Sequence, residues 1–106
     1  MGNQEVDMNA NKPLFIRRVV GTSMSPMLMP DKLIFASSMF RYVMPGQVVI
    51  VEHEGKQKVK RIERIENDKI FVIGDNLQSS TDSRHFGWLK PHQISLLEDI
   101  PPGSVV

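Results

Sequence analysis

The run QVVIVEHE, residues 47–54, places four β-branched residues in a row between Pro45-Gly46 and Gly55. Val and Ile are enriched in β-strands, whereas Pro and Gly mark the turns that bound them. The run therefore predicts a strand. Three runs of the same kind lie on either side of it: LFIRRVV (14–20), KLIFA (32–36) and KIFVIG (69–74). Turn residues separate these runs too closely for long helices, so the sequence predicts an all-β domain of antiparallel hairpins.

The segment KQKVKRIERIEND, residues 56–68, fits two structures. Val59, Ile62 and Ile65 recur every three residues, which suits a helix. A strand would instead place alternate residues on opposite faces. Its first face would carry Lys58, Lys60, Ile62 and Arg64, and its second Val59, Arg61, Glu63 and Ile65. The pattern alone leaves both structures open.

The length of 106 residues predicts one compact domain with a single core. Residues 1–13 are polar and end in Pro13, and residues 98–106 contain paired prolines and a glycine. Such ends are expected to form a flexible leader and a flexible tail. The body, residues 14–97, is the expected catalytic domain.

The composition excludes several classes of protein. Basic and acidic residues nearly balance, with a net charge of +1, whereas a dedicated nucleic-acid binder is usually strongly basic. The absence of Cys excludes disulfides, zinc fingers and Cys nucleophiles. His53, His85 and His92 are too scattered to predict a metal site, so we expect no metal and no cofactor. No apolar run is long enough to span a membrane or act as a secretory signal, and we expect a cytoplasmic protein.

Three short polar segments stand out from the rest of the chain. They are GTSMSPML (21–28), Lys60-Arg61-Ile62, and GDNLQSSTDSRHFG (74–87). In this order they resemble the signal peptidase I family of serine proteases. That family carries Ser-Met-x-Pro after a strand, Lys-Arg on a later strand, and Gly-Asp-Asn…Ser-x-Asp-Ser-Arg…Gly near the end. The resemblance covers about residues 19–97 and implies an antiparallel β fold like that of LexA-type repressors, with the ambiguous segment as a strand.

The resemblance also implies the chemistry. A serine hydroxyl needs a base to become a nucleophile, and a lysine can be that base if burial keeps it neutral. Lowering a lysine pKa from about 10.4 to 7–8 takes roughly 3–5 kcal/mol of differential solvation. The family pattern assigns the nucleophile to Ser23, the base to Lys60 and the orienting hydroxyl to Ser80. From the residues alone, Ser25 competes with Ser23, Ser79 and Ser83 compete with Ser80, and a His base or a solvated Lys60 is an alternative.

The neighbours of these residues have expected roles too. Gly21, Thr22 and Met24 are assigned to the oxyanion hole and substrate binding, with the hole resting chiefly on the backbone N–H of Ser23. We expect Asp82 and Arg84 to form an ion pair that stiffens the loop, and Asp75 to pair with Arg61. These charges would otherwise be solvated loop residues.

Two sets of apolar residues each allow two interpretations. Met24, Met27 and Met29 line substrate pockets or pack in the core. The connector Phe35–Met44 is a docking surface, with Phe40 and Tyr42 as anchors, or it is core.

The sequence departs from the family pattern at three turns. The first Pro-Gly-Asp reads Met29-Pro30-Asp31, and the second reads Pro45-Gly46-Gln47. Gly21 stands where some members carry a Ser that helps hold the oxyanion. We expect altered turns at the first two sites, and no loss of chemistry.

Within the family, the chain most resembles the small, anchorless nickel-type superoxide dismutase maturation proteases, in its size and in the wording STDSRHFG (80–87). This resemblance implies an endopeptidase that removes an N-terminal leader from a precursor protein, namely the nickel superoxide dismutase precursor. The alternatives are an unanchored signal peptidase-like enzyme with other precursors, a LexA-type self-cleaving dimerisation module, and an inactive peptide-binding domain. The sequence leaves the oligomeric state open.

Overall fold

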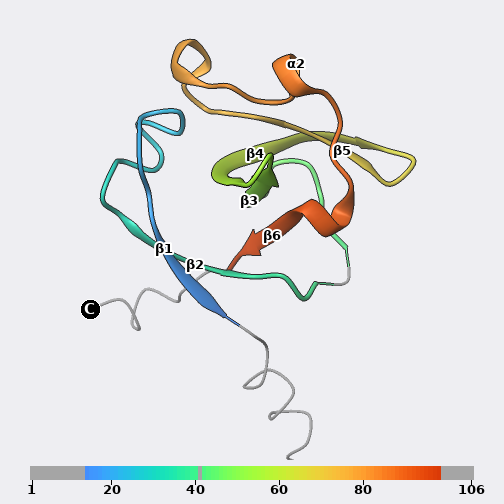
Figure 1. The fold of residues 1–106 in the computed structure, drawn as a ribbon, viewed down its shortest axis with the longest axis horizontal. Helices are drawn as coiled ribbons and strands as arrows, with labels where there is room; N and C mark the ends of the chain where they lie inside the picture. The colour runs from blue at the N-terminus through green and yellow to red at the C-terminus, as the bar shows by residue number, and fades with distance from the viewer. Residues whose placement is uncertain (1–13, 41, 99–106) are drawn as a thin grey trace, which may run out of the picture.

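The computed structural model describes residues 14–40 and 42–98. Within them, six strands form one antiparallel sheet in the order β1-β2-β6-β3-β4-β5 (Figure 1). The strands are β1 (Phe15–Arg18), β2 (Leu33–Ser37), β3 (Val48–His53), β4 (Lys56–Glu66), β5 (Lys69–Ile73) and β6 (Ile94–Leu97). The helical turns are η1 (Leu77–Ser79), α2 (Ser83–Phe86) and η2 (Pro91–Gln93). The predicted all-β antiparallel fold is confirmed. The expected leader lies outside the described residues, as does the expected tail beyond Glu98.

The position of strand β3 explains why the four residues 48–51 are all apolar. Val49 and Val51 belong to one core cluster and Ile50 to a second cluster on the other face. Successive strand residues point to opposite faces, so a strand covered on both sides needs apolar residues throughout. The first cluster joins β3 to β4, β5 and β6, and the second joins it to β1 and β2. In Figure 1, β1 and β2 lie at the bottom and α2 at the top.

The ambiguous segment is a strand, β4, paired with β3 on one side and β5 on the other. Lys60 and Ile62 share a buried face, as expected for a strand. Arg64 was expected on the same face, and that expectation is wrong. The register shifts between Ile62 and Arg64, and such a bulge turns the following side chains over. Arg64 is exposed and its guanidinium lies 4.5 Å from the Phe71 ring centre.

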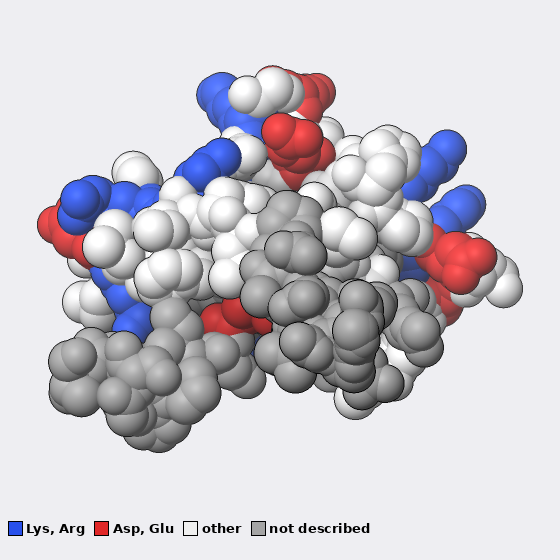
Figure 2. Space-filling view, turned by 90° about the horizontal axis from the view of Figure 1, so that it is seen from below, with Lys and Arg blue, Asp and Glu red and all other residues white. Residues whose placement is uncertain are grey.

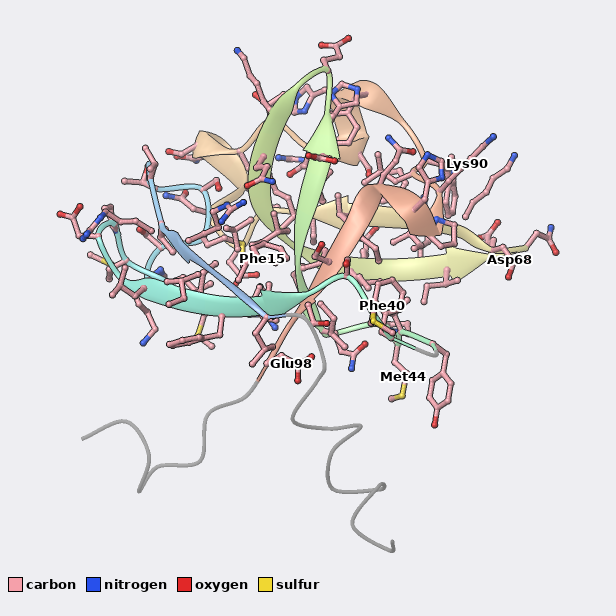
Figure 3. The ribbon with its side chains drawn as sticks, turned by 60° about the horizontal axis from the view of Figure 1, so that its bottom comes forward. Phe15, Phe40, Met44, Asp68, Lys90 and Glu98 are labelled. Atoms are coloured by element: carbon pink, nitrogen blue, oxygen red, sulfur yellow. The ribbon has the colours of Figure 1, made fainter. Side chains whose placement is uncertain are left out.

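The connector after β2 divides between the two expected roles. Phe40 and Val43 pack against the first core cluster, whereas Tyr42 is 74% exposed. Phe40 and Met44 lie near each other and away from Phe15 of β1 (Figure 3). Core packing therefore accounts for Phe40, and Tyr42 remains a surface residue.

The surface carries its charges unevenly. On the face in Figure 2, charged side chains lie mainly around the margin, and the described central part is largely uncharged. Within residues 14–40 and 42–98, no helix is long and apolar enough to cross a membrane.

Candidate active site

Ser23 lies in a compact turn that follows β1. The backbone N–H of Ser25 donates to the Thr22 carbonyl oxygen, and that of Leu28 donates to the Met24 carbonyl oxygen. Gly21 begins the turn with φ of 81°, a conformation that favours glycine. This backbone requirement explains a glycine where some signal peptidases carry a Ser.

The Ser23 turn is fastened to the loop that follows β5. The Asn76 backbone N–H donates to the Ser23 carbonyl oxygen over 2.7 Å, and the Asn76 side-chain amide donates to the Thr22 carbonyl oxygen over 3.0 Å. A Cβ on Gly74 would lie 2.7 Å from the Ser23 carbonyl oxygen and 2.5 Å from Ser80 Cβ. Only a glycine leaves room for the two loops to meet here, which accounts for the glycine in Gly-Asp-Asn.

Lys60 is buried, with 2% of its surface exposed, and projects from β4 toward this junction. Its Nζ donates a hydrogen bond to Ser80 Oγ over 2.9 Å, and Ser80 Oγ donates in turn to Asp82 Oδ2 over 2.6 Å. Because the Ser80 hydroxyl gives its proton to Asp82, it accepts from the lysine. The lone pair of a neutral Lys60 amine is then free to take a proton from another group.

Ser23 and Lys60 line the same cavity, which has a volume of about 220 Å³. Its apolar wall comes from Val20, Ile50 and Val59. Ser23 and a buried amine thus line one partly open cavity of the size of a few side chains.

The surroundings of Lys60 shift its pKa to about 8. Burial is the main cause, because it disfavours the charged form. The Asp82 carboxylate opposes the shift, and the positive charges of Lys58 and Arg84 add to it. A large part of Lys60 is therefore neutral at mildly alkaline pH.

This pKa predicts the pH dependence of peptide cleavage. We expect kcat/KM to rise with pH through a midpoint near 8, because only the neutral amine can accept a proton from Ser23. Lys58→Gln should move the midpoint to higher pH, since it removes a positive charge that lowers the pKa. The control His53→Ala should leave the midpoint in place. A midpoint near 6.5 that disappears with a His substitution would instead identify a His base.

Asp82 is fully buried and has more partners than the sequence suggested. Besides Ser80, it accepts hydrogen bonds from the Gly74 backbone N–H and from the Arg84 guanidinium and backbone. It also caps α2, where the His85 ring accepts from the Asp82 backbone N–H. Burial alone would raise the pKa of Asp82, but these donors outweigh it and hold the pKa well below its usual range. Asp82 therefore supports the Lys60–Ser80 pair as a carboxylate.

The other expected ion pair, Arg61 with Asp75, is bidentate, with both N–O distances at 2.8 Å. The Arg61 guanidinium also donates to the Gly46 carbonyl oxygen. The pair thus ties the loop after β5 to β4 and to the turn before β3.

Only one of the three serines proposed to orient Lys60 contacts it. Ser80 bonds Nζ, Ser79 is exposed, and Ser83 Oγ accepts from the Val72 backbone N–H. Ser83 is therefore a link between α2 and β5. The contact between Ser80 and Asp82 was not predicted, because Asp82 was expected only as a partner of Arg84.

Several other candidates lie elsewhere. Met24 is 1% exposed and its sulfur accepts from the Asp75 backbone N–H, so it packs in the interior and does not line an open substrate pocket. Ser25 Oγ is buried and has no hydrogen-bond partner among the residues that the structure describes. His53 stacks on Phe86, with ring centres 4.3 Å apart. None of the three histidines is among the residues that line the Ser23 cavity.

The chain is similar to known proteins. Residues 3–86 match the family model of the Peptidase S24-like proteins, and this range contains Ser23, Lys60 and Ser80. The chain belongs to the Peptidase S24-like family. It is also 30% identical over 93 residues to mitochondrial inner membrane protease subunit 1 of Mus musculus, an alignment that covers 63% of this chain and 56% of the relative. The chain thus spans little more than half the length of that relative. Both the family and this relative are named as peptidases or proteases.

Proposed function

We propose that this member of the Peptidase S24-like family is a serine endopeptidase in which Lys60 is the base for Ser23. One observation carries the proposal: a buried lysine with a lowered pKa lines the same cavity as Ser23. The family match supports the peptidase activity, and the resemblance to signal peptidases supports the roles of the two residues.

The proposed reaction has two halves. Ser23 Oγ attacks the scissile carbonyl carbon while its proton passes to Lys60 Nζ, and the Ser23 backbone N–H stabilises the oxyanion. The protonated lysine then gives its proton to the leaving amine, which leaves an acyl-enzyme. A water molecule deprotonated by Lys60 hydrolyses the ester and restores Ser23. Ser80 and Asp82 hold the amine in place through both halves.

The proposed substrate is a precursor protein that loses an N-terminal leader, namely the nickel superoxide dismutase precursor. The wording of residues 80–87 and their likeness to the maturation proteases support this choice. The cytoplasm, expected from the sequence, is the proposed place of action. A signal peptidase-like enzyme that processes other precursors is the main alternative within the same chemistry.

Two precursors distinguish these substrates. We expect the purified protein to trim nickel superoxide dismutase precursor at the end of its leader, and to cleave isolated leader peptides more slowly. Ordering a short peptide costs about 0.5–1.5 kcal/mol per immobilised side chain, which a folded precursor largely avoids. The measurement is mass spectrometry of the new N-termini, with Ser23→Ala as the blank. If the protein cleaved a secretory preprotein but not the superoxide dismutase precursor, it would be a general signal peptidase and not a maturation protease.

Self-cleavage is the second candidate, because LexA-type repressors share the Ser-Met and Lys pair. It predicts that the chain alone shortens at alkaline pH at a rate independent of its concentration. An unchanged mass after such incubation would remove this candidate.

A further inference from the structure

We propose that the peptidase selects precursor segments that carry Asp or Glu beside the scissile bond, and that Arg17 and Lys58 recognise these carboxylates. The proposal rests on the peptidase function above and specifies its substrate class. It concerns the cavity that holds Ser23, and it starts from the charge of the cavity walls.

The described residues that line this cavity are strongly biased in charge. Four of the nine are basic and none is acidic; they are Arg17, Arg18, Val20, Ser23, Ile50, Gln57, Lys58, Val59 and Lys60. The chain as a whole has a net charge of only +1, so the cavity departs from the average of the protein. A groove with walls of one sign concentrates ligands of the opposite sign.

Arg17 is held in place at one wall. It pairs in register with Ile34, which is buried, so its side chain leaves β1 on the inner face of the sheet. Its Nε donates to Gln57 Oε1 over 2.7 Å, and its guanidinium lies 4.6 Å from the Phe15 ring centre. β1 and β4 are not neighbours in the sheet, so the bond to Gln57 bridges the opening between them. An arginine fixed in this way loses little freedom when it binds a carboxylate.

Lys58 supplies charge from β4, where it pairs with Val51 and so leaves the strand on the other face from Gln57 and Val59. It lies two residues before Lys60 on β4, on the same face, and it is half-buried. Its Nζ is 5.2 Å from the Phe86 ring centre. Within residues 14–40 and 42–98, neither Lys58 nor Arg17 forms an ion pair with a carboxylate. Both charges are therefore available to a ligand.

A peptide bound in the cavity changes the solvation of these two charges. A bound peptide displaces the water that solvates Arg17 and Lys58, and a desolvated charge without a partner is costly. A substrate carboxylate supplies the partner, whereas a neutral side chain of the same shape does not. Discrimination against Asn and Gln follows from this difference.

The positive charge belongs to the catalytic side of the groove. A second cavity of about 230 Å³ shares Arg17, Ile50 and Gln57 with the first, but it contains Glu52. An acidic side chain is thus favoured toward Ser23 and opposed beyond Arg17. Lys58 and Ser23 are both among the residues that line the cavity, so an extended chain that reaches Ser23 passes the basic residues as well. The geometry favours a peptide as the ligand.

The test reads the cleaved bonds of a large mixture of natural peptides by mass spectrometry, and then measures matched synthetic pairs. Each pair differs only by Glu against Gln, or Asp against Asn, beside the cleaved bond. We expect about tenfold higher kcat/KM for the acidic member, as one charge-assisted hydrogen bond would give, and a ratio that falls with added salt. Arg17→Gln and Lys58→Gln should each move this ratio toward one, and Arg17→Glu should reverse it.

Arg64→Gln is the matched control, because Arg64 is also on β4 but stacks on Phe71 outside the cavity; it should keep the wild-type ratio. Equal cleavage of both members by the wild type would overturn the acidic preference and leave the peptidase function intact. No cleavage of any peptide or precursor would instead remove the proposed function. Binding to phosphatidylglycerol vesicles that is lost in Arg17→Gln and Lys58→Gln, with a peptide ratio of one, would assign the basic residues to lipid.

Discussion

Lys60→Ala and Ser23→Ala should each lower kcat/KM for precursor cleavage by about 10⁴-fold or more, because nucleophile and base act as one unit. The Lys60 amine is the one buried base among the described residues that line the Ser23 cavity. Without it, no neighbouring group removes the serine proton. The double variant should be no worse than either single variant. The measurement is the rate of appearance of the trimmed N-terminus, beside thermal unfolding to confirm that each variant is folded.

Two matched substitutions control for nonspecific damage. Lys56→Ala removes an exposed lysine from the same strand, and Ser25→Ala removes a buried hydroxyl without a hydrogen bond to any described residue. Both should keep nearly full activity. If a folded Lys60→Ala retained more than a few per cent of the wild-type rate at pH 9, another group would have to be the base.

The sequence predicted four of the six strands because their side chains are β-branched and bounded by turn residues. It left β4 open because Val59, Ile62 and Ile65 satisfy a helical period as well. The bulge that separates Ile62 from Arg64 made that coincidence possible, since it shifts the alternation of a strand by one residue. The family resemblance implied a strand, and the pairing of β4 with β3 and β5 confirms it.

Strand β6 was not predicted at all. It has four residues and follows a short helical turn, so its local pattern is weak. Its place between β2 and β3 comes from pairing with strands that lie far away in the sequence. Long-range pairing of this kind leaves little trace in a short window of sequence.

In the candidate site, too, the sequence predicted the residues but not the contacts that depend on the fold. The family resemblance assigned roles to Ser23, Lys60 and Ser80, but from the residues alone three serines competed for one role. The contacts that separate them depend on how the loop after β5 folds back, which Gly74 allows by leaving room for the Ser23 carbonyl oxygen. The network of Asp82 depends on the same fold-back, and a linear motif does not show it.

Asp82→Asn should weaken both the fold and the catalysis. The carboxylate accepts hydrogen bonds from Ser80, Gly74 and Arg84 while it is fully buried. An amide is uncharged, and it places a donor where these groups need an acceptor. Loss of charge-assisted hydrogen bonds costs about 3 kcal/mol, which lowers Tm of a domain this size by at least about 10 °C. With Ser80 released, Lys60 loses its orientation, and kcat/KM should fall by up to about 10²-fold.

Acid titration separates this role from simple packing. The pKa of Asp82 is lower in the folded chain than the value of about 3.9 in an unfolded one. The carboxylate therefore stabilises the fold above about pH 4, and this contribution is lost as pH falls further. Wild type should lose stability steeply in that range, and Asp82→Asn should lose less. The control is Asp68→Asn, at the exposed tip of the β4–β5 hairpin (Figure 3). It should have the same Tm, the same activity and the same loss of stability at low pH as the wild type. If the wild type and Asp82→Asn lost stability equally as the pH falls, Asp82 would not be held as a carboxylate.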